Sequence, residues 1–316
     1  MQKRVLVTGA AGFIGFHVAK ACINAGYFVT AIDNFNDYYT VSLKEDRAKE
    51  LQKLGLEVKR IDICDQSALI DLVKTEKITH IVHLAAHAGV RYSLEAPHEY
   101  VKTNIDGFVS ILEACRTGVK LVYASSAAVY GSNAHPPFAV DAHTDQQLEV
   151  YGVTKKTNEL FAECYHHLYD IPCTGLRFFT VYGPWGRPDM AYYSFTKAIL
   201  EGAPIQLYDA GKYRRDFIYV DDVVSAILTA LDYKGVGIMN VGSGVSKSVV
   251  ELVEAIETAT GKKANRVYLP SQKTEMPETR ADISQALIRP TISFEEGIGR
   301  FVSWYTRYFS SSVASP

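Results

Sequence analysis

A tyrosine and a lysine four residues apart are the first side chains in this sequence that could do chemistry. Tyr151 and Lys155 open a helical pattern over residues 151–168, and a spacing of four places both side chains on one helix face. Ser126 follows the apolar, strand-like residues 119–125, where its hydroxyl can lie beside the tyrosine. A nearby ammonium favours the phenolate and lowers the tyrosine pKa toward that of a usable general base. The three side chains together predict proton transfer at a substrate hydroxyl, although a Tyr-Lys pair alone is usually a surface pair.

Three glycines near the amino terminus predict a nucleotide-binding turn. They are spaced three residues apart, between a β-rich run, Arg4–Thr8, and a helical pattern over residues 13–25. Glycine permits a tight turn and a close backbone approach to a pyrophosphate, and the helix N-terminus adds unpaired N–H groups and a positive dipole. A glycine triplet alone is a weak signal, but here the strand before it and the helix after it agree. The predicted contacts in this turn are Gly9, Gly12, Phe13, Ile14 and Gly15.

An acidic residue at the end of the next β-rich run refines the cofactor prediction. Asp33 closes the run Phe28–Asp33 and can accept hydrogen bonds from the ribose diol of adenosine. Because a carboxylate there repels a 2′-phosphate, we favour NAD over NADP. The alternative role for Asp33 is that of an ordinary turn or helix-cap residue. Asp62 and Ile63 follow a later strand and are further candidates for the cofactor site. Ala85 and Ala86 are small residues, and Asn104 carries an amide, that could border the cofactor.

Apolar runs alternate with helical stretches through the first half of the chain, which predicts a parallel sheet covered on both faces. The expected fold class is α/β, with a Rossmann-type doubly wound sheet and a smaller, interleaved C-terminal substrate domain. We expect residues 1–180 to form the nucleotide-binding domain, with a return around residues 215–240, and residues 181–316 to be mainly substrate-binding. Residues 310–316 are expected to form a frayed tail.

Composition excludes several classes of partner. The 33 Lys+Arg against 35 Asp+Glu give a formal net charge of −2, so no broad basic field attracts nucleic acid or an anionic membrane. No apolar run of about 18 residues predicts a membrane span. The five cysteines show no paired or metal-ligand spacing, and His80, His83 and His87 suit strand ends better than a metal site. A soluble cytoplasmic protein without a bound metal is expected.

The glycine turn, the Ser126 segment and the Tyr151–Lys155 pair together resemble the extended short-chain dehydrogenase/reductase family over nearly the whole chain. Within the NAD-dependent epimerase/dehydratase group of that family, further segments are similar to the UDP-glucuronate 4-epimerase branch. These segments are residues 36–39, 41–45, 88–94, 175–190 and 215–219.

The resemblance implies a reaction. Tyr151 would take the proton from the sugar 4-hydroxyl while C4 passes a hydride to tightly bound NAD, and the 4-keto sugar would rotate before the hydride returns to its opposite face. UDP-glucuronate and UDP-galacturonate would interconvert, and NAD would be regenerated in each turnover. Lys155 would orient the nicotinamide ribose and Ser126 would assist proton transfer. The substrate positions that the resemblance implies are Arg91, Ser126, Ala127, Ala128, Thr180, Arg187, Arg215, Glu275 and Arg280.

Some of these positions depart from the family pattern. Oxidation at C4 of a glucuronate gives a β-keto acid that readily loses CO₂, and the family usually grips the carboxylate with hydroxyls where this chain has Ala127 and Ala128. Glu275 replaces a usual aspartate and Arg280 a usual aromatic residue. Among the arginines, Arg215 best suits the diphosphate because a guanidinium binds phosphate bidentately. The alternative for Arg91 and Arg187 is that they brace loops.

Three other functions stay open at this stage. A 4-epimerase of neutral UDP-hexoses (UDP-glucose or UDP-N-acetylglucosamine) agrees with the two alanines, whereas residues 185–190 favour the uronate. A UDP-glucuronate decarboxylase or a dehydratase starts with the same oxidation, but dehydration needs a carboxylate pair that Ala127 and Ala128 do not supply. A non-catalytic NAD-binding module would have no need of Ser126, Tyr151 and Lys155. The apolar faces of residues 97–115 and 151–168 further suggest a homodimer, unless both faces are buried within one chain.

Overall fold

The main sheet has seven parallel strands, and most residues of its central strands are buried because helices cover both faces. In β1, for example, Val5, Leu6 and Val7 are completely buried. The computed structural model describes residues 2–132, 135–270 and 276–313. The strands lie in the order β10 (Gly237–Val241), β6 (Cys173–Phe178), β5 (Lys120–Ser126), β4 (His80–His83), β1 (Arg4–Thr8), β2 (Phe28–Asp33) and β3 (Val58–Arg60).

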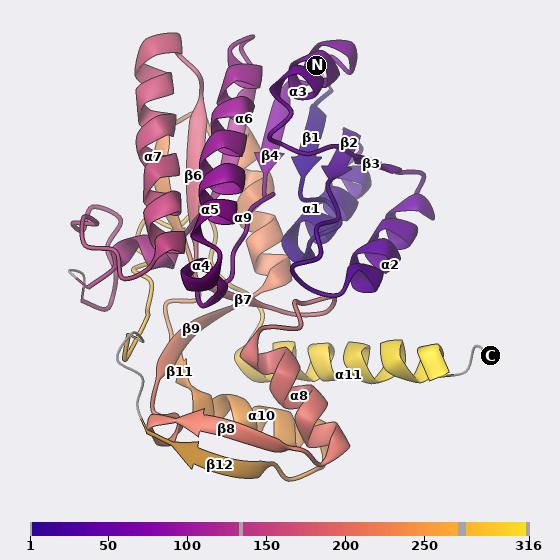
Figure 1. Cartoon of the computed structure of the whole chain (residues 1–316), viewed down its shortest axis with the longest axis vertical. Helices are drawn as coiled ribbons and strands as arrows, with labels where there is room; N and C mark the ends of the chain where they lie inside the picture. Colours follow the sequence, from indigo (N-terminus) through magenta and orange to yellow (C-terminus); the bar gives the residue numbers. More distant parts are fainter. Residues whose placement is uncertain (1, 133–134, 271–275, 314–316) are drawn as a thin grey trace.

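Two sets of helices sandwich this sheet and bury separate apolar clusters (Figure 1). One face carries α3 (Gln66–Thr75), α6 (Gly107–Cys115) and α7 (Val150–Tyr169). The opposite face carries α1 (Phe13–Asn24), α2 (Val41–Gln52) and α9 (Val220–Asp232). This layering confirms the predicted Rossmann-type fold class. Two elements from the second half of the chain belong to this layer structure: β10 is an edge strand of the main sheet, and α9 packs on its face. The chain therefore returns to the main sheet at residues 220–241.

A smaller lobe lies below the carboxyl ends of the main strands (Figure 1). It contains a three-stranded sheet of β7 (Thr180–Tyr182), β9 (Arg214–Tyr219) and β11 (Ser246–Ser248), and a two-stranded sheet of β8 (Pro204–Tyr208) and β12 (Asn265–Leu269). Its helices are α8 (Ala191–Glu201), α10 (Val249–Thr260) and α11 (Phe294–Val313).

The structure differs from the predictions in two local segments. The helical segment at residues 97–115 is α5 (Pro97–Tyr100), a π-helical stretch at Val101–Asp106, and α6, preceded by the short α4 (Tyr92–Glu95). The prediction of a frayed tail from residue 310 is wrong as far as residue 313, because α11 continues to Val313. The amphipathic face of α11 stabilises it by packing Phe301, Trp304 and Tyr305 into the larger core. Among the described helices, none is long and apolar enough to cross a lipid bilayer.

The strand order reverses between β1 and β4, and this reversal places the functional cleft. The chain leaves β1 toward β2 and β3 on one side, whereas β4 and β5 continue on the other. In open α/β sheets, ligands bind outside the carboxyl ends of the strands at such a switch point. Gly9 follows β1 there, and Ala85 closely follows β4.

Candidate active site

A single cleft of ≈ 960 Å³ extends from the glycine turn of the main sheet into the smaller lobe. Gly9 and Asp33 lie on its walls in the larger lobe, and Tyr208 and Arg215 come from the smaller lobe. A cleft of this size accommodates a ligand larger than one nucleotide.

Close backbone contacts explain the glycines of the turn. Gly9 has φ of +69°, and a Cβ on it would lie 2.8 Å from the amide nitrogen of Ala85. A Cβ on Gly15 would lie 2.0 Å from the carbonyl oxygen of Gly9. The turn therefore brings the ends of β1 and β4 together, and Phe13 and Ile14 at the N-terminus of α1 face the cleft. Side chains at the first and third glycine would block this approach.

Asp33 lies on the cleft wall with its carboxylate held by backbone amides. Its Oδ2 accepts from the Ala11 N–H at 3.0 Å and its Oδ1 from the Phe35 N–H at 2.8 Å. Burial raises the pKa of Asp33, and these two bonds together with the charge of Lys44 oppose that rise. Lys44, which the sequence did not single out, also lines the cleft and donates from Nζ to the carbonyl of Asn36 at 2.6 Å.

Three of the other predicted cofactor residues line the cleft, and two do not. Ile63, Ala85 and Ala86 line the cleft. Asn104 does not: its side chain bonds to the backbone N–H and the carbonyl of His87, both at 2.9 Å, and thereby holds the segment after β4. Asp62 does not line the cleft either, and its Oδ2 accepts from the exposed Asn34 amide at 2.9 Å.

The structure brings Ser126, Tyr151 and Lys155 together where β5 ends against α7. All three line the cleft, and Ser126 lies close enough to Tyr151 to oppose the rise of its pKa. Lys155 is buried, and its Nζ donates to the carbonyl of Ala124 at 2.9 Å. Burial lowers the pKa of Lys155 to about 8.

The expected lowering of the Tyr151 pKa by Lys155 is not found. Burial raises the pKa of Tyr151, and this outweighs the lowering by the Ser126 hydrogen bond and by the charge of Arg187. The nearby carboxylate of Glu149 raises it further. Protein groups alone therefore hold Tyr151 protonated, and a further positive charge is needed to make the phenol a base near neutral pH.

A buried ion pair joins α7 to the strands behind the catalytic residues. Glu159 accepts two hydrogen bonds from Arg177 of β6, at 2.8 and 2.9 Å, and one from the Ser125 hydroxyl at 2.6 Å. Arg177 also donates to the carbonyl of Val140 at 2.9 Å. Because Glu159 lies two turns after Tyr151 on the same helix, this pair sets the position of the helix against β5 and β6.

The predicted substrate residues occupy different parts of the cleft. Ala127, Ala128 and Thr180 line it beside Ser126. Arg187 is held by Asp189 through bonds of 3.0 and 2.5 Å, and Asp189 also accepts from the Tyr38 hydroxyl at 3.1 Å. Arg91 lies at the cleft with its guanidinium 5.8 Å from the centre of the Tyr208 ring.

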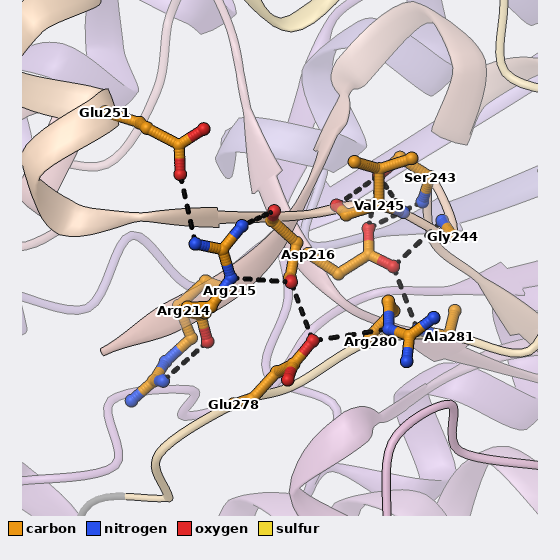
Figure 2. Close-up of polar contacts among 11 residues, drawn as sticks. Arg214, Arg215, Asp216, Ser243, Gly244, Val245, Glu251, Glu278, Arg280 and Ala281 are labelled. Carbon is orange, nitrogen blue, oxygen red and sulfur yellow. Dashed lines mark hydrogen bonds and ion pairs between the residues drawn. The ribbon is translucent and has the colours of Figure 1, made fainter. Parts of the chain in front are cut away.

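Arg215 and Arg280 lie in different surroundings (Figure 2). Arg215 lines the cleft, and its Nη1 donates to the carbonyls of Arg214 and Met276 at 2.8 and 2.9 Å. Arg280 is not on the cleft wall; its Nε donates to the Glu278 carboxylate at 3.2 Å. This placement favours a bracing role for Arg280 over the predicted substrate contact. The predicted position Glu275 lies outside the described residues.

Sequence reasoning missed several residues on the cleft wall, namely Tyr38, Lys44, Glu149 and Asp189. Tyr38 and Asp189 are 151 positions apart, so no spacing rule links them. The one available signal was their presence in segments that carry the family resemblance. Glu149 gave a weak local signal, because acidic side chains are favoured near a helix N-terminus.

Comparison with known proteins agrees with this geometry. Residues 5–242 match the NAD dependent epimerase/dehydratase family, and the chain belongs to that family. Within it, the chain is 43% identical to UDP-glucuronate 4-epimerase 4 of Arabidopsis thaliana, over 97% of this chain and 76% of the relative.

Solved structures of two epimerases have the same fold. The UDP-glucuronic acid 4-epimerase of Bacillus cereus, in complex with UDP-glucuronic acid and NAD, is 34% identical with a TM-score of 0.89; the match covers 96% of this chain and 99% of that one. The UDP-glucose 4-epimerase of Thermotoga maritima, with UDP-glucose, is 29% identical with a TM-score of 0.89; the match covers 97% and 99%. The expected family resemblance is therefore confirmed.

Removing the charge of Glu159 tests the bracing of α7. We expect Glu159→Gln to lower the free energy of unfolding by roughly 3 kcal/mol, because Arg177 then stays buried without a counter-ion. Urea unfolding measures the change. The matched control Glu163→Gln, on an exposed position of the same helix, should stay within about 0.5 kcal/mol of the wild type. Equal effects of the two substitutions would argue against a bracing role.

Replacing Lys155 should make the protein more stable. Its pKa of about 8 lies below the ordinary 10.5, so we expect Lys155→Met to raise the free energy of unfolding at pH 7 by roughly 1–3 kcal/mol. Between these pKa values the unfolded wild type binds the proton that the folded protein has lost, so wild-type stability rises with pH there. The advantage of Lys155→Met in urea unfolding should therefore shrink at about pH 9.5. An advantage that is the same at both pH values would contradict a buried charge at Lys155.

Proposed function

We propose that this protein catalyses the NAD-dependent 4-epimerisation of UDP-glucuronate to UDP-galacturonate. The observation that carries the proposal is that Ser126, Tyr151 and Lys155 line one continuous cleft between the glycine turn and Arg215. With NAD at the glycine turn and the diphosphate at Arg215, the sugar carbon that carries the reacting hydroxyl would lie beside Ser126 and Tyr151. The relatives named as UDP-glucuronate 4-epimerases, and the Bacillus cereus complex with UDP-glucuronic acid and NAD, support the choice of substrate.

The larger lobe suits the NAD half of this arrangement. Gly9, Gly12 and Gly15 line the cleft where α1 begins, and the N-terminus of a helix suits a pyrophosphate. Asp33 offers a carboxylate to a ribose diol, and its negative charge disfavours NADP. The chemistry supplied by NAD is acceptance of a hydride from sugar C4 and its return to the opposite face, so NAD is regenerated in each turnover.

Residues of the chain remove and return the proton of the sugar 4-hydroxyl. Tyr151 takes the proton of the sugar 4-hydroxyl, and the Ser126 hydroxyl bonds to both oxygens and keeps them aligned. Burial keeps the Tyr151 phenol protonated until a cationic ring lies beside it, so proton removal is coupled to the loaded cleft. Lys155 remains mostly charged at neutral pH because its pKa is about 8, and it can hold a ribose hydroxyl next to Tyr151.

The smaller lobe suits the UDP half. Arg215 presents a guanidinium to the cleft, which matches a diphosphate, and Arg91 lies at the cleft beside Tyr208. Arg187 and Thr180 are the candidates for the sugar carboxylate, since Ala127 and Ala128 bring no hydroxyl. We assign residues 1–180, with the return near 215–240, to NAD and the remainder mainly to the UDP-sugar.

The proposal extends to a homodimer in the cytoplasm. Exposed apolar side chains form a stripe along α7 at Val153, Leu160 and Leu168, which are 47%, 54% and 59% exposed. Cys164 is exposed on the same stripe, and Val101 of the neighbouring segment is 42% exposed. Such a stripe on a well-formed helix is typical of a surface that a second copy covers. The five cysteines are all free thiols, as a reducing compartment favours.

Product analysis tests the reaction. The wild-type protein, incubated without added NAD, is expected to convert UDP-glucuronate to UDP-galacturonate as followed by NMR, because tightly bound NAD is recycled. Tyr151→Phe should lower turnover by at least about a thousandfold, since no other group takes the proton, and should still retain NAD. A pentose product with released CO₂ would instead indicate a decarboxylase. Undiminished turnover by Tyr151→Phe would remove Tyr151 from the mechanism.

Charge placed on the α7 stripe tests the dimer. Leu160→Glu is expected to convert the dimer to a monomer in sedimentation velocity, because it buries a charge at an apolar contact. Leu54→Glu, at an exposed leucine on another surface, should leave the oligomeric state unchanged. A wild-type protein that sediments as a monomer would refute this part of the proposal.

A further inference from the structure

Helix α2 buries two cations beside the glycine turn. Lys44 and Arg47 are 4% and 0% exposed, and a spacing of three places both side chains on one face of the helix. Arg47 donates to the carbonyl of Ala11, a residue of the glycine turn, at 3.0 Å. Lys44 lines the cleft, whereas Arg47 does not. This face of α2 is therefore held against the turn at which a dinucleotide places its diphosphate.

The partners of these two cations carry no formal charge. Lys44 donates from Nζ to the backbone carbonyl and the side-chain oxygen of Asn36 at 2.6 and 2.8 Å, and this Nζ lies 4.8 Å from the centre of the Tyr39 ring. Arg47 donates to backbone carbonyls and to the Tyr39 hydroxyl. In the described part of the chain, neither cation forms an ion pair with a carboxylate. Asp33 acts on Lys44 through its charge, but backbone amides already hold its carboxylate.

A buried cation without a counter-ion is unfavourable, and the pKa of Lys44 shows this cost. Burial lowers the pKa of Lys44, the negative charge of Asp33 opposes the decrease, and the positive charges of Arg47 and Arg187 add to it. Arg187 is itself paired with Asp189. An anion beside Lys44 removes the cost because it supplies the missing negative charge, whereas a neutral ligand leaves the cost in place.

We propose that Lys44 binds the diphosphate of NAD and that the charge of Arg47 strengthens this binding. The inference rests on the proposed function, in which the dinucleotide lies at the glycine turn. There the N-terminus of α1 offers backbone N–H groups, and Lys44 brings a full positive charge from α2. The diphosphate of the UDP-sugar is assigned to Arg215 in the smaller lobe, so each diphosphate has its own cation. Lys44 is a binding residue, and no proton or hydride passes through it.

The variants for the test remove the charge and keep the helix. Lys44→Met retains an unbranched side chain, and Lys44→Gln retains an N–H donor for the oxygens of Asn36. Lys49→Met removes the same charge from an exposed position of α2 and is the matched control. Because a charge-assisted hydrogen bond to phosphate is lost, the affinity for the diphosphate should fall roughly ten- to a hundredfold in both Lys44 variants.

The experiment compares two ligands that share adenine and ribose but differ in phosphate. ADP-ribose carries the diphosphate of NAD, and adenosine carries no phosphate. Full-length protein is freed of bound nucleotide with charcoal, calorimetry gives the Kd of ADP-ribose, and NMR titration gives that of adenosine. We expect the adenosine-to-ADP-ribose Kd ratio to fall roughly ten- to a hundredfold in Lys44→Met and Lys44→Gln. This ratio should not change in Lys49→Met, and the uridine-to-UDP Kd ratio should not change in any variant.

Each outcome separates the inference from the proposed function. A general disturbance of the site weakens both adenosine ligands equally, so an unchanged ratio in both Lys44 variants, or an equal fall in Lys49→Met, would overturn the inference. A fall in the uridine-to-UDP ratio alone would overturn it as well, because Lys44 would then serve the substrate diphosphate. If the wild type binds ADP-ribose but epimerises no UDP-glucuronate, the proposed function fails, and the Kd ratios still decide the role of Lys44.

Discussion

The buried ion pair between Glu159 and Arg177 is the interaction on which the rest of the site depends. A helix turns by about 100° per residue, so a slip of one residue along α7 would carry Tyr151 away from Ser126. Glu159 prevents such a slip because it bonds to Arg177 of β6 and to Ser125 at the same time. Ser125 directly precedes Ser126, so the ion pair sets the position of Ser126 on β5 relative to Tyr151 on α7.

A second buried cation links the two lobes around the same cleft. Arg47 of α2 is completely buried and donates to the carbonyl of Ala11 in the glycine turn at 3.0 Å. It also donates twice to the carbonyl of Trp185, at 3.1 and 2.6 Å. Trp185 has φ of +61°, an uncommon conformation for an aromatic residue, and Arg187 follows two residues later. The segment that carries Arg187 is thus linked to the nucleotide-binding turn through the Arg47 side chain.

The charges within the cleft account for how a nearly neutral protein can bind an anionic ligand. Its net charge is −2, yet Lys44, Lys155, Arg187 and Arg215 all face the cleft. Several of these cations already have protein partners, such as Asp189 for Arg187 and backbone carbonyls for Arg215. Cations placed locally in the cleft therefore take the role of a broad positive field.

The sequence by itself determined the features that depend on neighbours along the chain. The glycine turn, Asp33 at the end of β2 and the Tyr151–Lys155 spacing are local patterns, and the apolar runs indicated a parallel sheet because strands covered on both faces have no polar side. Only the tertiary structure decided that Asn104 and Asp62 do not line the cleft, that Arg280 bonds to Glu278, and that Tyr38 bonds to Asp189. It also showed that α11 continues to Val313. These contacts join residues far apart in the chain, so their partners are set by how the lobes pack and leave no periodic trace in the sequence.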